Sequence, residues 1–220
     1  MNDGEVGFFS QFVILALEDS WFSSNVDRKK QVLSSMRGHG DVRSHIYLSL
    51  GFKSNADMII WRLSRKPEEL QSEHIEFRKN IAGLGKIIAI YTGISRPSTY
   101  TGKEGEFEAL SDPKKRSRYL SIYPFTKTPE WYLLDVDKRR KIMVEHIAIG
   151  RKFPKVRQVL LYSFGADDQE FVVAYETDDL KYYIECVMSL RESESRLYTK
   201  VDTPVFTGTI LDETNEHLIL

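Results

Sequence analysis

The order of apolar runs along this chain repeats once, and that repeat constrains the fold more than any other feature of the sequence. Runs rich in Ile, Val, Phe, Tyr and Leu, bounded by Gly, Asn, Asp or Pro, are typical of strands. Stretches with helical spacing separate them, and Pro67 followed by two glutamates is typical of a helix N-terminus. In the first half we expect strands at 7–17, 43–52, 57–64 and 86–95, and helices at about 25–37 and from 67 onward.

The same order, β-α-β-β-α-β, returns after a loop at about 96–117 that is rich in Gly, Ser, Pro and charge. The hairpins of the two halves also match, because Gly51 and Gly165 are 114 positions apart, as are Trp61 and Tyr175. This predicts a duplicated ferredoxin-like unit of the α+β class, whose open sheet faces pack together or close into a barrel. The second-half strands are expected at 118–126, 156–164, 170–176 and 200–210, and the helices at about 136–152 and 178–198.

The composition excludes several classes of function. The 220 residues carry 31 Lys and Arg against 32 Asp and Glu, so the chain offers no overall positive field for nucleic acid or an anionic membrane surface. With Cys186 as its one cysteine, it can form neither an internal disulfide nor a cysteine-held zinc or iron–sulfur site. The apolar run at 12–17 is too short for a signal core or a membrane span. We expect a soluble cytoplasmic protein that binds neither nucleic acid nor membrane.

Two polar residues interrupt the apolar helix faces of the second half. His146 lies in the apolar stripe of the first of these helices, and Glu194 continues the stripe of the last. Counting back 114 positions gives Val32 and Asn80, so the first repeat has neither residue. A lone inward histidine is more often a core residue than a metal ligand, and Glu194 could instead pair with an arginine beside it. If the two meet, the carboxylate accepts the Nδ1–H of the imidazole and leaves Nε2 free to bind a metal.

One histidine and one glutamate are too few for a closed zinc site, whereas haem iron needs only one protein ligand. Three residues on the second-half strands could add to such a site. Gln158 shares the parity of two apolar neighbours, Tyr123 lies on the preceding strand, and Lys127 lies at the end of that strand. Each also has an ordinary structural interpretation: a strand-end hydrogen bond for the amide, packing for the tyrosine and a solvated charge for the lysine.

Several segments, in a fixed order, resemble the chlorite dismutase family, which includes the coproheme decarboxylases. The resemblance covers most of the chain and is densest between Tyr123 and Tyr198. The segments are RPS at 96–98, YPFTK at 123–127, WYLL at 131–134, RRKIMVEH at 139–146, GR at 150–151, SFGADDQEF at 163–171, and LR at 190–191 with Glu194.

The resemblance implies a dimeric α+β barrel of two ferredoxin-like halves, 1–117 and 118–220, which form one structural domain. It also implies a homo-oligomer, usually a pentamer, with haem b or coproheme in the C-terminal half. His146 matches the proximal ligand of the haem iron, and Glu194 matches the carboxylate behind it. Gln158 falls on the distal position, where members that make oxygen from chlorite carry arginine. An anionic oxidant needs a fixed cation, whereas an amide can hold neutral peroxide, so the coproheme decarboxylase branch is favoured.

In that branch the resemblance implies further roles. Hydrogen peroxide oxidises the iron, Tyr123 loses a hydrogen atom, and the phenoxyl takes hydrogen from a propionate β-carbon, so that loss of CO₂ leaves a vinyl group. Lys127 matches a cation near the propionates, Trp131 matches a tryptophan near the pocket, and Arg196 and Tyr100 are candidates to reach the propionates. The alternatives are a haem-binding or haem-sensing protein without turnover, a true chlorite dismutase, and a scaffold that binds no haem.

Overall fold

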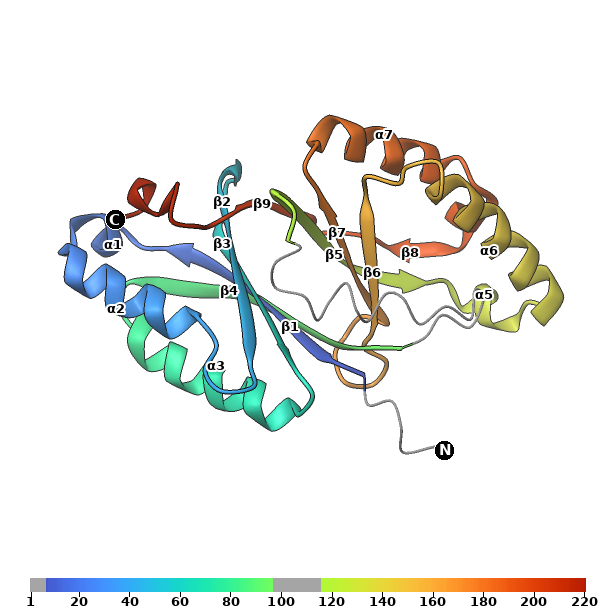
Figure 1. Cartoon of the computed structure of the whole chain (residues 1–220). Helices are drawn as coiled ribbons and strands as arrows, with labels where there is room; N and C mark the ends of the chain where they lie inside the picture. The colour runs from blue at the N-terminus through green and yellow to red at the C-terminus, as the bar shows by residue number, and fades with distance from the viewer. Residues whose placement is uncertain (1–6, 97–115) are drawn as a thin grey trace. The chain divides into compact units, whose positions relative to one another are not determined.

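The structure of the protein, a computed structural model, describes residues 7–96 and 116–220. The chain packs as two compact units, which Figure 1 shows. The first unit holds the described residues up to Ser95 together with Phe206–Leu220, and the second holds those from Arg96 to Val205. In the described ranges, no helix is both long enough and apolar enough to cross a membrane.

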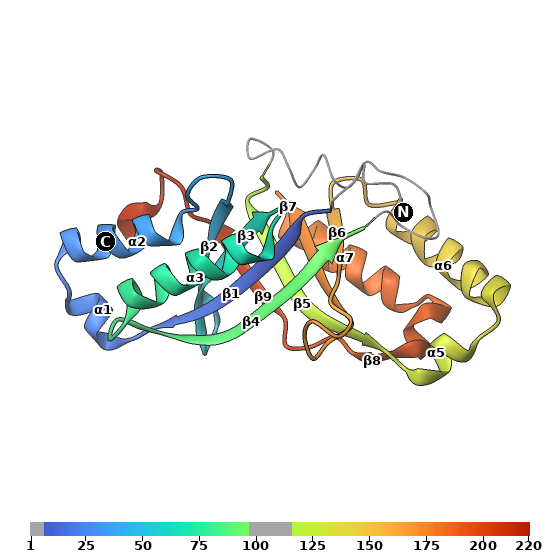
Figure 2. The same ribbon diagram turned by 90° about the horizontal axis from the view of Figure 1, so that it is seen from below.

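The first unit is an antiparallel sheet in the order β4-β1-β3-β2-β9, with α2 and α3 along one face (Figure 2). Val13 and Leu15 of β1 point to this face and pack with Leu33 and Met36 of α2 and Phe77 of α3. All five side chains are buried, so the layer between sheet and helices is a filled apolar core. The elements are β1 (Phe9–Leu17), α1 (Asp19–Ser23), α2 (Val26–Met36), β2 (Arg43–Lys53), β3 (Ala56–Ser64), α3 (Pro67–Ile81), β4 (Gly85–Ser95), β9 (Phe206–Ile210) and a short helix, η3 (Glu216–Leu218).

Local sequence explains where these elements begin and turn. Asn25 caps α2 by accepting the backbone N–H of Arg28 at 2.8 Å, and Pro67 occupies the first turn of α3. Gly51, near the turn between β2 and β3, has a φ of 84°, and Gly165 has a φ of 72° in the second unit. Only glycine adopts this left-handed backbone without steric cost, which explains the matching hairpin glycines of the two halves.

The second unit is an antiparallel sheet in the order β6-β7-β5-β8, with α6 and α7 along one face (Figure 1). Asp135 caps α6 by accepting the N–H of Asp137 at 2.8 Å. The helix expected at 136–152 is confirmed within two residues. The elements are β5 (Tyr119–Lys127), α5 (Pro129–Leu133), α6 (Val136–Gly150), β6 (Arg157–Tyr162), β7 (Phe171–Thr177), α7 (Leu180–Arg191), η2 (Glu194–Tyr198) and β8 (Thr199–Val201).

Two predicted elements at the end of the chain are wrong. The strand expected at 200–210 is two strands, β8 and β9, and β9 pairs with β2 of the first unit through Tyr47 and Ile210. The expected halves, 1–117 and 118–220, place residues 206–220 in the second half, whereas these residues pack with the first unit. The helix expected at 178–198 ends at Arg191, because the Ser193 hydroxyl and backbone N–H both donate to the Leu190 carbonyl and close the last turn. A separate 3₁₀ helix, η2, follows.

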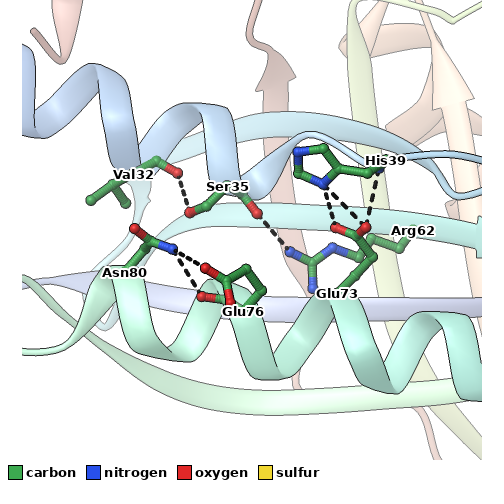
Figure 3. Close-up of polar contacts among 7 residues, drawn as sticks. All are labelled: Val32, Ser35, His39, Arg62, Glu73, Glu76 and Asn80. Atoms are coloured by element: carbon green, nitrogen blue, oxygen red, sulfur yellow. Dashed lines mark hydrogen bonds and ion pairs between the residues drawn. The ribbon is translucent and has the colours of Figure 1, made fainter.

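The repeat has a different register from the one the hairpins suggest. Helices α2 and α6 begin 110 positions apart, at Val26 and Val136, and β1 and β5 also begin 110 positions apart. The residue that corresponds to His146 is therefore Met36, not Val32. Figure 3 shows Val32 and Asn80 among the polar contacts of α2 and α3: the Ser35 hydroxyl donates to the Val32 carbonyl, and the Asn80 amide donates to Glu76. Neither residue corresponds to a member of the predicted His–Glu pair.

Candidate functional site

The layer between sheet and helices in the second unit is open and forms a cavity of about 740 Å³. The strands contribute alternate side chains, which all point to one face of the sheet. On β6, for example, Gln158 and Leu160 line the cavity, and Val156 just before the strand lines it too. The shared parity predicted for these three residues is confirmed. Across the cavity lie residues of α6 and α7, among them His146, Met143 and Leu190.

His146 is a half-buried residue of α6 in the cavity wall. Burial, with a smaller contribution from the nearby Lys127 charge, lowers its pKa to about 4, although Glu145 partly opposes the shift. The imidazole is therefore neutral at neutral pH. Its Nδ1 lies 2.9 Å from the Ser195 hydroxyl and 3.1 Å from the Ser193 hydroxyl. Both serines are buried, so one edge of the ring is held from the protein interior.

Glu194 does not meet His146, so the predicted pair is wrong. The Glu194 side chain is exposed, and its backbone N–H lies 3.4 Å from a carboxylate oxygen of Glu145. The prediction extended the helical spacing of α7 past its end at Arg191, where the helical phase stops. In η2 the inward residue is Ser195. Sequence reasoning missed both serines, because serine is common at helix ends and the pattern Ser-Glu-Ser carries no signal of its own.

Lys127 and Trp131 lie together in the cavity wall. The lysine is 7% exposed, its Nζ lies 4.4 Å from the centre of the Trp131 ring, and it donates to the Ser195 carbonyl at 3.2 Å. Burial lowers the pKa of Lys127 to about 8, with Glu170 opposing the shift. The Lys127 side chain is thus a buried cation held by Ser195, the serine that contacts His146. It is not a solvated charge at the end of a strand. Its predicted role toward propionates remains a prediction.

Tyr123 lines the cavity from β5 and packs on Tyr175 of β7, with ring centres 6.0 Å apart. Burial raises the pKa of Tyr123, although a hydrogen bond with Tyr175 partly opposes the shift. The phenol therefore keeps its proton at neutral pH. Tyr183 of α7 also packs on Tyr175, with ring centres 5.3 Å apart, so Tyr175 contacts both of the other phenols. A tyrosine that holds its hydrogen beside a cavity has the chemistry of a hydrogen-atom donor.

Positive charge dominates the cavity wall. Among the lining residues that the structure describes, six are Arg or Lys and the one acid is Asp202, which lies 3.1 Å from Arg191 and also pairs with Arg196. Arg139, one of the six, has a buried Nε with no hydrogen-bond partner among the described residues. Such a wall suits a ligand with several carboxylates. Tyr100, the other candidate for the propionates, lies outside the described residues, as do Pro97 and Ser98.

The family model described as "Chlorite dismutase" matches residues 23–211. The chain belongs to the chlorite dismutase family. This confirms the resemblance that the sequence motifs carry. The coproheme decarboxylase of Mycolicibacterium smegmatis is 29% identical over 186 residues, which cover 83% of this chain and 79% of that protein.

Solved structures of chlorite dismutases share the fold. A crystal structure of a protein assigned to the chlorite dismutases has a TM-score of 0.84 and 27% identity, over 98% of this chain and 100% of its own. A mutant chlorite dismutase from Candidatus Nitrospira defluvii has a TM-score of 0.84 and 23% identity, over 98% and 97% of the two chains. The predicted fold class, an α+β fold of ferredoxin-like repeats, is confirmed.

Proposed function

We propose that this chlorite dismutase family member binds an iron porphyrin through His146 and acts as a peroxide-dependent coproheme decarboxylase that makes haem b. The observation that carries the proposal is one cavity wall that combines a neutral histidine with a strong excess of cations. Coproheme is an iron porphyrin with four propionates, so it needs both features. The relative from Mycolicibacterium smegmatis, described as a coproheme decarboxylase, supports the choice of reaction.

The residues present fit an iron porphyrin. The cavity of about 740 Å³ lies in the range of cofactor pockets, roughly 300–1,000 Å³. Its apolar wall, with Leu160, Val173 and Leu190, suits the face of a macrocycle. Haem iron takes a single histidine as its protein ligand, and His146 presents Nε2 without a hydrogen-bond partner in the described part of the chain. The unpaired Nε of Arg139 offers a donor to a carboxylate.

The proposed mechanism gives a separate role to each group of cavity residues. His146 holds the iron, the wall cations orient the propionates, and the Gln158 amide offers a neutral hydrogen-bond partner to peroxide. The bound iron porphyrin supplies the redox chemistry by which peroxide oxidises the protein. Tyr123 gives up its phenolic hydrogen atom and regains one from a propionate β-carbon, so it ends each round unchanged. In each round one propionic acid group and one H₂O₂ yield one vinyl group, one CO₂ and two H₂O.

Gln158 also decides between substrates. The same position would need a fixed cation to hold anionic chlorite, whereas an amide donates and accepts hydrogen bonds without charge. Chlorite should therefore release no oxygen with this protein. A homopentamer remains a prediction from the family, and a cytoplasmic location remains a prediction from the composition. Sedimentation of the purified protein tests the pentamer.

Coproheme titration followed by hydrogen peroxide and mass spectrometry tests the proposal. The product should be lighter than coproheme by two CO₂ and four hydrogen atoms. Tyr123→Phe should bind coproheme and lose turnover, while Tyr182→Phe, a tyrosine of α7 that donates to the Lys152 carbonyl outside the cavity, should react normally. Intact coproheme after peroxide has been consumed contradicts the decarboxylase proposal. A Soret shift with no product would leave only haem binding, and no shift at all would overturn both.

A further inference from the structure

Two buried serine hydroxyls lie beside the His146 ring, and their hydrogen bonds decide which ring nitrogen carries the hydrogen. Ser193 and Ser195 lie 3.0 Å apart, and both contact Nδ1 of the imidazole. They are 3% and 5% exposed, so water does not compete for these contacts. The direction of each hydrogen bond follows from counting hydrogens, because a serine hydroxyl has one hydrogen to donate.

The count begins at Ser193. Its hydroxyl lies 2.7 Å from the Leu190 carbonyl oxygen, which can only accept, so the one Ser193 hydrogen is used there. Ser193 therefore accepts from its other neighbours. If Ser195 donates to Ser193, the Ser195 oxygen is free to accept the Nδ1–H of His146 at 2.9 Å. In this arrangement all three short contacts are hydrogen bonds.

The Nε2–H tautomer leaves one of these contacts without a hydrogen bond. With the hydrogen on Nε2, Nδ1 must accept, and only Ser195 still has a hydrogen to give it. The contact of 3.0 Å between Ser193 and Ser195 is then left without a hydrogen between the two oxygens. A net buried hydrogen bond contributes on the order of 1 kcal/mol, so the network favours Nδ1–H by about fivefold.

We propose that Ser193 and Ser195 together are the positioning residues that fix His146 as its Nδ1–H tautomer and so present the Nε2 lone pair to the cavity. Ser195 is the nearer acceptor, and Ser193 is the hydroxyl whose own hydrogen is already used at Leu190. Insofar as that lone pair binds iron, the inference rests on the proposed function. Ser195 is itself fixed, because its carbonyl accepts from the buried ammonium of Lys127 at 3.2 Å. The imidazole therefore presents mainly an unprotonated Nε2 to the cavity before any iron arrives.

The neutral partner also sets the electron donation of the ligand. A carboxylate behind a histidine pulls on Nδ1–H and makes the imidazole more basic, whereas a hydroxyl accepts more weakly. The exposed position of Glu194 leaves His146 with hydroxyl partners only, among the hydrogen bonds of the described residues. Replacing Ser195 by aspartate should therefore strengthen the iron–histidine bond, and replacing it by alanine should weaken it.

Nitrogen NMR of the protein without porphyrin tests the tautomer directly. In ¹⁵N-labelled wild-type protein at neutral pH, Nδ1 of His146 should carry the hydrogen and Nε2 should not. Ser193→Ala should lower the ratio of the Nδ1–H to the Nε2–H tautomer about fivefold, because the Ser195 hydroxyl can then donate to Nδ1 or accept from it equally well. Ser195→Ala should keep most of the preference, because Ser193 still donates to the Leu190 carbonyl and can only accept from Nδ1. Ser193→Thr should keep it too. Ser189→Ala, which removes a hydroxyl from the last turn of α7 away from the ring, is the matched control.

The loaded protein gives a second measurement. Resonance Raman spectra of the ferrous haem complex should show the iron–histidine stretch rise in Ser195→Asp and fall in Ser195→Ala. A wild-type Nε2–H tautomer, or a ratio that Ser193→Ala leaves unchanged, overturns the inference, and the wild-type measurement needs no variant to fold. Since the NMR experiment contains no porphyrin, its result stands whether or not the decarboxylase proposal fails.

Discussion

The two units put different side chains at the same places between sheet and helices. In the first unit Val13 and Met36 fill this layer, and 110 positions further on the second unit has Tyr123 and His146 around a cavity. At the end of the strands Leu17 likewise corresponds to Lys127. The scaffold is shared, down to a buried tryptophan after each first strand, Trp21 and Trp131. A layer that holds a cavity thus differs from a filled core layer by a few polar substitutions on one face, with no change in the order of the elements.

The largest expected effect concerns stability, because the two layers should respond differently to the loss of a large side chain. Leu33 is 1% exposed in the filled layer, so Leu33→Ala should lower the free energy of unfolding by about 2–5 kcal/mol. Met143, 110 positions further on, borders the cavity, and Met143→Ala should cost less than about 1 kcal/mol because fewer contacts are lost. Urea unfolding of both variants measures the difference. Equal losses would mean that the second layer is as well packed as the first.

The second test exchanges the polar residue for an apolar one. His146→Leu should leave the fold intact and weaken coproheme binding by about tenfold or more, because the iron loses its protein ligand. Metal-free coproporphyrin should bind wild type and variant alike, since the cations of the wall hold its carboxylates in both. Fluorescence titration with the two porphyrins separates these contributions. Unchanged coproheme affinity would mean that His146 does not bind the iron.

The third test concerns charge in the wall. Arg139→Gln should weaken binding of metal-free coproporphyrin by about tenfold, because a charge-assisted hydrogen bond to a carboxylate is lost. Arg140→Gln is the matched control, since this neighbour is exposed and pairs only weakly, at 3.9 Å, with Asp137. The same titration measures both. An equal loss in the two variants would indicate general attraction rather than a contact of Arg139.

The smallest expected effect is a pH dependence that both units share. Burial lowers the pKa of His74 in the first unit and of His146 in the second to about 4, from the ordinary 6.5. The folded state binds fewer protons between these values, so the cost of burying each ring is absent above pH 6.5 and appears as the pH falls toward 4. We expect about 1 kcal/mol per histidine, reduced for solvent screening because both side chains are partly exposed. Urea unfolding of wild type, His74→Phe and His146→Leu at pH 7 and 4.5 measures it, and equal pH dependence in all three would contradict it.

Periodicity predicted the order of the elements and the face of the sheet that bears the site. It placed His146, Gln158, Tyr123 and Lys127 on elements that surround one cavity. The prediction failed at the end of α7, because the helical spacing of apolar residues says nothing about the hydrogen bonds by which Ser193 closes the last turn.

That failure moved the predicted partner of His146 by one residue, from Ser195 to Glu194. The offset of 114 fits the hairpin glycines but not the first strands and helices, which are 110 positions apart. It pairs Trp61, which stacks on Phe12, with Tyr175, which packs on Tyr183 of α7. Trp61 is absent from the core cluster that packs on α2 and α3, so the two aromatic residues lie on different faces of their sheets.

A crystal structure of the protein prepared with coproheme would show which unit binds the porphyrin and which side chain binds its iron. We expect one porphyrin per chain in the cavity of the second unit, with iron bound to Nε2 of His146, Nδ1 facing Ser195, and no porphyrin in the filled layer of the first unit. An iron held by any other side chain, or a cavity without porphyrin in protein that has bound coproheme, would contradict it.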